Sequence, residues 1–275
     1  MSTFMSDFKK VVVFLGRTND KREVSFCATA IIAEIKNVFH LITAKHVVMD
    51  MESNTLFDSD LRAFWNSKGG DIASRSISNI KTKLSSEWIF HRNRGVDIAI
   101  IPFGFDEDDD IMAIPSEMFF PVDNSLEISD IFFLTYQPGI EPVKRIYPVI
   151  RSGIISLVNE DGTYYIDAAA FPGNSGSPVF LKSTFIKSTE RKVVISEDPL
   201  AGKFIGVIGE YLPYQEIAVS MQTHRPRVIF EENTGLSRVW SVTFIKEIIE
   251  SGSFQEQVDR LIKGGTYGNT STKTQ

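Results

Sequence analysis

Short apolar runs separated by polar and turn-forming residues fill the first part of the chain. Runs of this length predict β-strands, and the Lys36-Asn37 pair between two of them is typical of a tight turn. Their alternation is imperfect, as expected where both faces of a strand meet a barrel interior and neighbouring elements. A short helical turn is expected at residues 44–49. The predicted strands cover residues 10–17, 23–35, 38–43, 61–65, part of 72–84, and a run that begins at residue 97.

The second part of the chain repeats this pattern with more Gly and Pro punctuation. Several short strands at such spacing favour a second antiparallel barrel or sandwich. Two polar stretches, 182–201 and 212–237, are too long for hairpin turns and are predicted to be surface loops flanking a cleft. The strands are expected at residues 131–135, 145–158, 163–167, 177–181 and 203–211.

The chain ends in a helical pattern followed by a polar tail. Residues 241–250 carry apolar side chains at helical spacing, and Ser241 is placed to cap the helix. Residues 264–275 are rich in Gly, Thr, Ser and Asn and are expected to be disordered, as is a loose start at residues 1–8.

Composition and charge limit the classes of function. The 275 residues are 43% hydrophobic and 23% charged, which is ordinary for a globular protein. The formal net charge is −6, from 29 basic and 35 acidic residues, and no basic block is interleaved with aromatic residues. We therefore expect neither nucleic acid nor an anionic membrane as a partner.

The single cysteine, Cys27, allows no intramolecular disulfide, which points to a reducing compartment. The apolar run at 11–15 is too short for the core of a signal peptide, and no run reaches transmembrane length. These observations predict a cytoplasmic protein.

The predicted organisation is an N-terminal barrel at residues 1–110, a C-terminal barrel with a terminal helix at 111–250, and a helical extension with a disordered tail at 251–275. Five consecutive acids at 106–110 repel one another and are predicted to form a solvated linker between the halves. Calcium binding is the alternative, but the run lacks the alternating ligands and the glycine of a calcium loop.

The second half contains a candidate nucleophile. It is Ser175, which lies between glycines in the stretch FPGNSGSP at residues 171–178. Flanking glycines let a turn expose the Ser175 hydroxyl and aim backbone N–H groups into the same space, as an acyl-transfer nucleophile requires. An ordinary loop turn remains the alternative for this stretch alone.

A serine nucleophile needs a base and a group that orients the base. His46 directly follows an apolar run, and Asp97 begins another. In the order His46, Asp97, Ser175, these segments resemble the catalytic segments of the trypsin-like (chymotrypsin-fold) serine peptidases. Chain order matters, because the same triad occurs in other orders on other folds.

The resemblance extends over roughly residues 10–250 and is closest to the protease domain of bacterial HtrA-like enzymes, without a PDZ domain. It implies an all-β fold of two six-stranded antiparallel β-barrels with a C-terminal helix. The further segments that carry it are residues 25–32, 132–139, 152–156 and 204–209.

The resemblance also implies roles for individual residues. Ser175 would attack a peptide carbonyl, His46 would act as the base and Asp97 would orient it. The N–H groups of Gly173 and Ser175 would form the oxyanion hole. Substrate backbone would pair with the segment Gly209, Glu210 and Tyr211, and Ala169 would form the floor of an apolar specificity pocket. The implied partner is a protein or peptide substrate, with no cofactor and no metal; the oligomeric state stays open.

Three positions depart from the family pattern. Asn174 replaces an aspartate that pairs with a newly cut N-terminus in many secreted members, so activation by N-terminal cleavage is not expected. Ser177 replaces a glycine, and Gly209 stands where a serine often supports the aspartate. No reacting group is lost.

The sequence offers residues for other functions as well. His40, His91 and His224 show no metal-ligand spacing and are expected to be structural or surface residues. Ser175, Asp198 and His224 have the chain order of an α/β-hydrolase, but Ser177 breaks the required glycine of its nucleophile elbow. A non-catalytic peptide-binding or scaffolding domain on the same fold is the remaining alternative.

Overall fold

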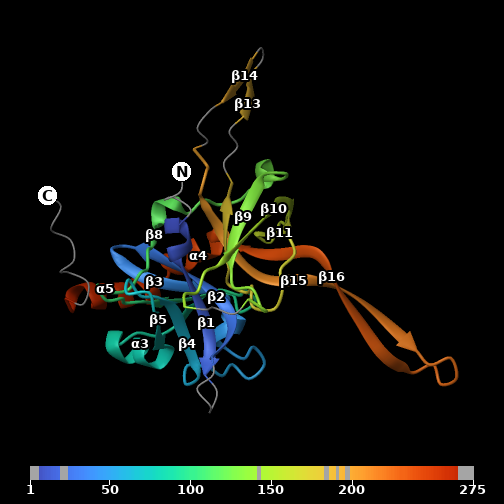
Figure 1. Cartoon of the computed structure of the whole chain (residues 1–275), viewed down its shortest axis with the longest axis horizontal. Coiled ribbons are helices and arrows are strands. Elements are labelled where there is room, and N and C mark those ends of the chain that lie inside the picture. The colour runs from blue at the N-terminus through green and yellow to red at the C-terminus, as the bar shows by residue number, and fades with distance from the viewer. Residues whose placement is uncertain are drawn as a thin grey trace.

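The computed structural model describes residues 6–18, 24–140, 144–182, 186–189, 192–195 and 199–265. Residues 186–189 and 192–195 are described by their backbone alone. Most of the expected loose start, and the expected disordered tail from residue 266 onward, lie outside these residues. The chain folds into two β-rich halves followed by helices, which confirms the all-β, chymotrypsin-like prediction (Figure 1).

Eight strands of the N-terminal half form one sheet, in the order β5-β4-β1-β2-β3-β7-β6, with β8 pairing in parallel with β2. The sheet exceeds the expected six strands because two-residue strands, β6 and β8, join it. Among the described residues its pairing does not close into a ring. The strands are β1 (Val12–Thr18), β2 (Val24–Ile35), β3 (Val38–Thr43), β4 (Leu61–Asn66), β5 (Ile72–Ser76), β6 (Ile89–Phe90), β7 (Ala99–Pro102) and β8 (Ile114–Pro115).

Six strands of the C-terminal half close into an antiparallel barrel in the order β10-β11-β16-β15-β12-β9, as predicted. Apolar side chains from each strand meet inside it, including Phe133, Tyr164 and Val239. The strands are β9 (Asp130–Thr135), β10 (Val149–Val158), β11 (Thr163–Asp167), β12 (Pro178–Leu181), β15 (Phe204–Val219) and β16 (Pro226–Ser241).

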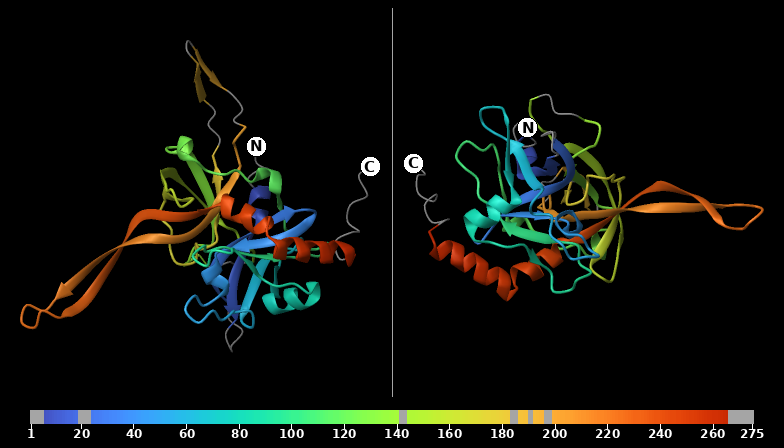
Figure 2. Two further views of the ribbon diagram at one scale, coloured as in Figure 1. Left: turned by 180° about the vertical axis from the view of Figure 1, so that it is seen from behind. Right: turned by 90° about the horizontal axis from the view of Figure 1, so that it is seen from below.

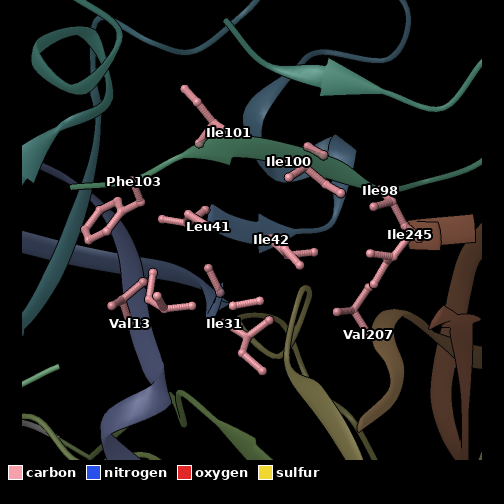
Figure 3. Close-up of a cluster of buried hydrophobic side chains, with 14 of the residues drawn as sticks. Val13, Ile31, Leu41, Ile42, Ile98, Ile100, Ile101, Phe103, Val207 and Ile245 are labelled. Atoms are coloured by element: carbon pink, nitrogen blue, oxygen red, sulfur yellow. The ribbon is translucent and has the colours of Figure 1, made fainter. Parts of the chain in front are cut away.

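One continuous apolar core joins the two halves. Figure 3 shows Leu41 and Ile100, from β3 and β7, in the same cluster as Val207 of β15 and Ile245 of the C-terminal helix α4 (Val242–Ile249). All four side chains are fully buried. Because both faces of the central strands are covered, their sequences are continuously apolar and do not alternate.

Two helices follow the barrel (Figure 2). Ser241 caps α4 by accepting a hydrogen bond from the N–H of Thr243, as predicted, and a second helix, α5, covers Gly252–Lys263. The buried Phe254 of α5 stacks on His40 of β3, with ring centroids 4.9 Å apart, so α5 packs against the N-terminal half. Within the described ranges, no helix is long and apolar enough to cross a membrane.

Short helices complete the N-terminal half and the connection between the halves. Ser76 caps α3 by accepting a hydrogen bond from the N–H of Asn79. The remaining helices are η1 (Lys9–Val11), α2 (Lys45–Val48), α3 (Ile77–Leu84), η2 (Ser116–Met118) and η3 (Asn124–Leu126).

The sequence predicted that the acidic run at 106–110 is solvated. In the structure, two of its side chains also form ion pairs. Asp106 lies 2.9 Å from Arg75, and Asp110 lies 3.0 Å from Lys10. Cations from distant strands and turns therefore offset the mutual repulsion of the acids.

The stretch at 212–237, predicted to be a loop, is instead the extension of β15 and β16 into a two-stranded arm. The arm projects from the barrel in every view (Figures 1 and 2). The other predicted loop, 182–201, contains the antiparallel pair β13 (Ile186–Thr189) and β14 (Lys192–Ile195).

Candidate active site

The pairing of β3 with β7 brings His46 and Asp97 together. Thr43 lies opposite Ala99 in the antiparallel register. His46 lies three residues after Thr43, in α2, and Asp97 lies two residues before Ala99. Two side chains that are distant in the sequence therefore meet at one end of the N-terminal sheet.

A chain of hydrogen bonds links Asp97, His46 and Ser175. The Nδ1 of His46 lies 2.7 Å from Asp97 Oδ2, and its Nε2 lies 2.9 Å from Ser175 Oγ. The other Asp97 oxygen accepts a hydrogen bond of 2.8 Å from the backbone N–H of His46. Since Nδ1 faces a carboxylate, it carries the proton, and Nε2 is left as an acceptor for the serine hydroxyl. The side chain of His46 is 40% exposed and that of Asp97 only 14%, so the imidazole is open to solvent while the carboxylate is shielded.

The turn that carries Ser175 is fixed to the N-terminal sheet. The N–H of Thr29, in β2, donates to the carbonyl of Ser175 at 3.0 Å, and the N–H of Gly176 donates to Ile208 at 2.7 Å. Gly176 has φ of +78°, and a Cβ there would collide with Thr29 O and Thr43 Oγ1. Only glycine fits this position, because it tolerates positive φ and leaves room for the close approach.

Two backbone N–H groups beside Ser175 are free to bind a ligand. In the described part of the chain, neither Gly173 N–H nor Ser175 N–H donates a hydrogen bond. The carbonyl of Gly173 points elsewhere, because it accepts a bond of 3.2 Å from Thr29 Oγ1. The arrangement can therefore stabilise negative charge on an oxygen next to the serine.

The surroundings of His46 shift its basicity. Burial by itself lowers the pKa of the imidazole, but the hydrogen bond and the charge of Asp97, together with the charge of Glu210, outweigh it and raise the pKa above its ordinary value. The protonated imidazole is thus stabilised, as a general base requires after it accepts a proton.

A cavity of about 510 Å³ adjoins Ser175. Gly209, Glu210 and Tyr211 line it, but Ala169 does not, and its neighbour Ala170 does. Ala170 is set there by its backbone: its N–H donates to Ser237 Oγ at 3.0 Å, and its carbonyl accepts from Asn233 at 2.6 Å. The remaining wall is formed by Phe171, Pro172, Ile208, Met51, Gly95, Arg238 and Trp240.

The charges at this cavity are paired. Arg238 Nη1 lies 3.7 Å from Glu210, and its Nη2 lies 3.0 Å from Asp161. The guanidinium also lies over the Trp240 ring, 4.9 Å from its centroid. Asp167, at the end of β11, is exposed and does not line the cavity.

The other histidines lie away from this site. His40 is buried with its Nδ1 2.9 Å from Val38 O, and the Nε2 of His91 lies 2.7 Å from a carboxylate oxygen of Glu247 in α4. His224 is exposed in the turn at the tip of the arm. Asp198, which an α/β-hydrolase reading required, lies outside the described residues. Among those residues, no three His, Cys, Asp or Glu side chains gather to hold a metal.

The model of the family described as "Trypsin-like peptidase domain" matches residues 28–184, more than half of the chain and a stretch that contains His46, Asp97 and Ser175. The chain belongs to this trypsin-like peptidase family. The crystal structure of a serine endoprotease from Yersinia pestis is also similar, with a TM-score of 0.46 and 13% sequence identity. The match covers 94% of this chain and 64% of that one. No curated protein matches the chain.

Two departures from the trypsin-like pattern have structural partners. Asn174 is fully buried; its amide donates to Tyr136 O at 2.6 Å, and its carbonyl oxygen accepts from Phe171 N–H at 2.8 Å. Ser177 is also buried and donates to Thr135 Oγ1 at 2.8 Å. Neutral hydrogen bonds thus anchor the serine loop to Thr135 at the end of β9 and to Tyr136, the residue that follows it.

Sequence reasoning missed the partners of this loop. Thr29 binds it through both its N–H and its hydroxyl, and Tyr136 holds Asn174. Neither residue lies in a motif of reacting groups. Thr29 lies within an apolar strand and Tyr136 directly after one, and neither position signals a contact with the serine turn.

Proposed function

We propose that the protein is a serine endopeptidase that hydrolyses peptide bonds through His46, Asp97 and Ser175. The observation that carries the proposal is the continuous hydrogen-bond chain from Asp97 through His46 to the serine hydroxyl. A structural turn would not require a half-exposed imidazole that bridges a shielded carboxylate and a serine.

The reaction would begin with attack of Ser175 Oγ on the substrate carbonyl carbon, while His46 Nε2 accepts the hydroxyl proton. Collapse of the tetrahedral intermediate breaks the C–N bond, and the same imidazole gives its proton to the leaving amine. A water, deprotonated by His46, then attacks the acyl-enzyme and releases the acid and the free serine. Asp97 holds the imidazole in the required tautomer throughout.

Ser175 Oγ also lies 3.2 Å from Gly209 O, so the free hydroxyl has two acceptors. The hydroxyl is activated only when it donates to His46 Nε2. A substrate strand that pairs with the backbone of Gly209 and Tyr211 would position the scissile carbonyl against the N–H groups of Gly173 and Ser175. Each such donor is worth roughly 10²–10³ in rate in other hydrolases.

We propose a preference for apolar side chains before the cleaved bond. The cavity beside Ser175 has apolar walls from Ala170, Phe171 and Ile208, and Glu210 is already paired with Arg238. Burying an unpaired cation against apolar walls is costly. Each methylene discriminates by only about 1–3 kcal/mol, so the preference is broad.

The single cysteine supports the further proposal that the protein works in a reducing compartment such as the cytoplasm, because the fold is built without a disulfide.

Labelling with a fluorophosphonate probe tests the nucleophile. The wild type is expected to be labelled, Ser175→Ala not at all, and His46→Ala only weakly while remaining folded. Ser78→Ala, in α3, serves as the matched control and is expected to be labelled like the wild type. A folded wild type that stays unlabelled between pH 7 and 9 contradicts the proposal and favours a peptide-binding role.

Profiling with a peptide library tests the specificity. Cleavage after Ala, Val, Leu or Met is the expected result. A strict requirement for Arg or Lys before the cut would contradict it and would implicate Glu210 or Asp167 as the recognition charge.

A further inference from the structure

The arm formed by residues 212–233 exposes apolar side chains to solvent along its length. Met221 is 87% exposed, and Ile217, Ile229 and Phe230 are each more than half exposed. An isolated two-stranded hairpin is marginal in water, and exposed apolar surface of this extent marks an interaction site. The arm projects clear of the barrel (Figures 1 and 2), so nothing in the described part of the chain covers it.

Within the described residues, the outer edge of β16 in the arm is unpaired. There, residues 226–233 of β16 pair only with β15, whereas β11 begins to pair with β16 at Leu236. An open edge of this kind presents backbone N–H and C=O groups to another strand.

The side chains along this edge are complementary to themselves. Ile229 and Glu231 are alternate residues of β16 and lie on one face, and Arg227 stands two residues before Ile229, at the β-bulge where the β15–β16 register shifts, so Ile229 lies midway in the sequence between a cation and an anion. If β16 pairs antiparallel with a copy of itself about Ile229, Arg227 lies opposite Glu231, and Val228 lies opposite Phe230. Each such pair occurs twice by symmetry.

We propose that two copies of this chain form a two-fold dimer by antiparallel pairing of β16 with β16 across Ile229, which joins the two arms into a four-stranded sheet. The pairing covers residues 227–231. Pro226 lies at its end, where its missing N–H cannot serve the ladder.

The charged groups of the arm support a second copy of this chain as the partner. Arg227 forms no ion pair within the described residues, and Arg225 forms none either. Glu231 is held by hydrogen bonds from Tyr211 and Gln215, which lower the pKa of its carboxyl and keep it ionised. A free cation and a positioned anion at equal distances from Ile229 fit a second copy of the same strand.

The opposite edge of the arm does not offer this match. If β15 paired with a copy of itself about Ile217, Glu216 would lie opposite Ala218 and Gln215 opposite Val219, with no opposite charges.

The length of the arm also leaves space between the barrels of the two copies. Ile229 lies seven residues from Leu236, where β16 joins its barrel, which is at most about 23 Å of strand on each side of the axis, since the strand is irregular around Gly235.

Sedimentation or light scattering of the full chain at about 1–200 μM tests the pairing. The wild type is expected to be a dimer. Arg227→Glu and Glu231→Arg are each expected to weaken it roughly 10- to 100-fold, because two attractive contacts become repulsive. The double exchange, Arg227→Glu with Glu231→Arg, is expected to restore the dimer. A monomeric wild type at all concentrations, or a dimer that neither single variant weakens, overturns the proposal.

Crosslinking fixes the register independently of activity. In a Cys27→Ser background, Ile229→Cys is expected to form a disulfide with itself across the axis, since directly opposite residues have Cβ atoms about 4.5–5.5 Å apart. Val228→Cys is the matched control and is expected not to crosslink, because it faces Phe230 of the second copy. Equal crosslinking of both variants, or of neither, overturns the register. Fluorophosphonate labelling of Ser175 is not required for either test, so its failure would not affect them.

Discussion

Trp240 occupies the space in which a side chain at position 209 would have to lie. A Cβ on Gly209 would come 2.6 Å from Trp240 Nε1 and 3.6 Å from Asp97 Oδ2. Gly209 stands where related peptidases often have a serine beside the aspartate. In this chain the indole fills that place, so the glycine is a packing requirement next to the triad.

Gly209→Ser is therefore expected to impair activity, although it restores the residue that is common in the family. The added side chain would press on Trp240 and lie against Asp97, and misplacing a catalytic group by about 1 Å can cost roughly 10²-fold in rate. Steady-state kinetics on wild type and variant measure the loss. The double variant Gly209→Ser with Trp240→Ala relieves the contact and is expected to recover part of it. Full activity of Gly209→Ser alone contradicts the packing argument.

Glu210→Gln is expected to move the onset of activity to lower pH. The reaction needs neutral His46, and the Glu210 charge contributes to raising the pKa of that imidazole. With that charge removed, the pKa falls, so the neutral base is present at lower pH. The pH profile of kcat/KM at low ionic strength measures the shift.

Glu256→Gln, on the exposed face of α5, is the control for that profile and is expected to leave it unchanged. Added salt should reduce the difference between wild type and Glu210→Gln, because charges near the surface are screened. Identical profiles for all three proteins would show that Glu210 does not act on His46.

Asn174→Asp is expected to reduce activity more than Asn174→Ala does. The alanine variant removes the acceptor of the Phe171 N–H and one of the two hydrogen bonds to the Tyr136 carbonyl, which also accepts from Thr135 Oγ1, at about 0.5–1.5 kcal/mol for each lost bond. The aspartate variant adds a buried charge that faces the Tyr136 carbonyl, another acceptor. Fluorophosphonate labelling rates and thermal unfolding measure both effects.

The exposed Asn124→Ala, in η3, controls for loss of an asparagine and is expected to behave like the wild type. If Asn174→Asp were fully active, the neutral anchoring of the serine loop would not matter for catalysis.

His40 is expected to make the fold sensitive to acid. Burial lowers its pKa to about 3, against about 6.5 in an unfolded chain. Between these values the unfolded state binds one more proton, so this residue's contribution to stability falls as pH falls, by up to about 1.4 kcal/mol per pH unit. Denaturant unfolding of wild type and His40→Leu from pH 7 to 4 measures the difference in slope.

The control for that experiment is His224→Leu, because His224 is exposed at the arm tip. Its pH dependence should follow the wild type. Equal slopes for His40→Leu and the wild type would refute the role assigned to His40.

His46, Asp97 and Ser175 could be selected as candidates from the sequence because each stands in a distinctive local context: His46 after an apolar run, Asp97 before one, and Ser175 between glycines. Their meeting in space could not be predicted, since it depends on the pairing of Thr43 with Ala99 and on the bond from Thr29 to the serine loop. Ala170 replaces Ala169 in the cavity for a similar reason, because side chains distant in sequence hold its backbone.

The arm escaped prediction because sequence patterns detect burial. Its strands carry Pro213, Glu216 and Glu231 among apolar residues, and both faces are open to solvent, so no period-2 alternation marks them. Residues 212–233 form strands because β15 and β16 pair with each other, and the sequence of one strand alone does not reveal this pairing.

The packing of α5 on β3 has a consequence for how the protein is made. Phe254 stacks on His40, and the side chain of Gln257 forms hydrogen bonds with both the N–H and the carbonyl of Glu87. Residues that are synthesised after both halves therefore cover the N-terminal half. A nascent chain whose barrel strands have already left the ribosome still lacks this cover. Domains fold as units during synthesis, the N-terminal one first, so this cover can be added to the N-terminal half only after the segment that ends at Lys263 has been synthesised.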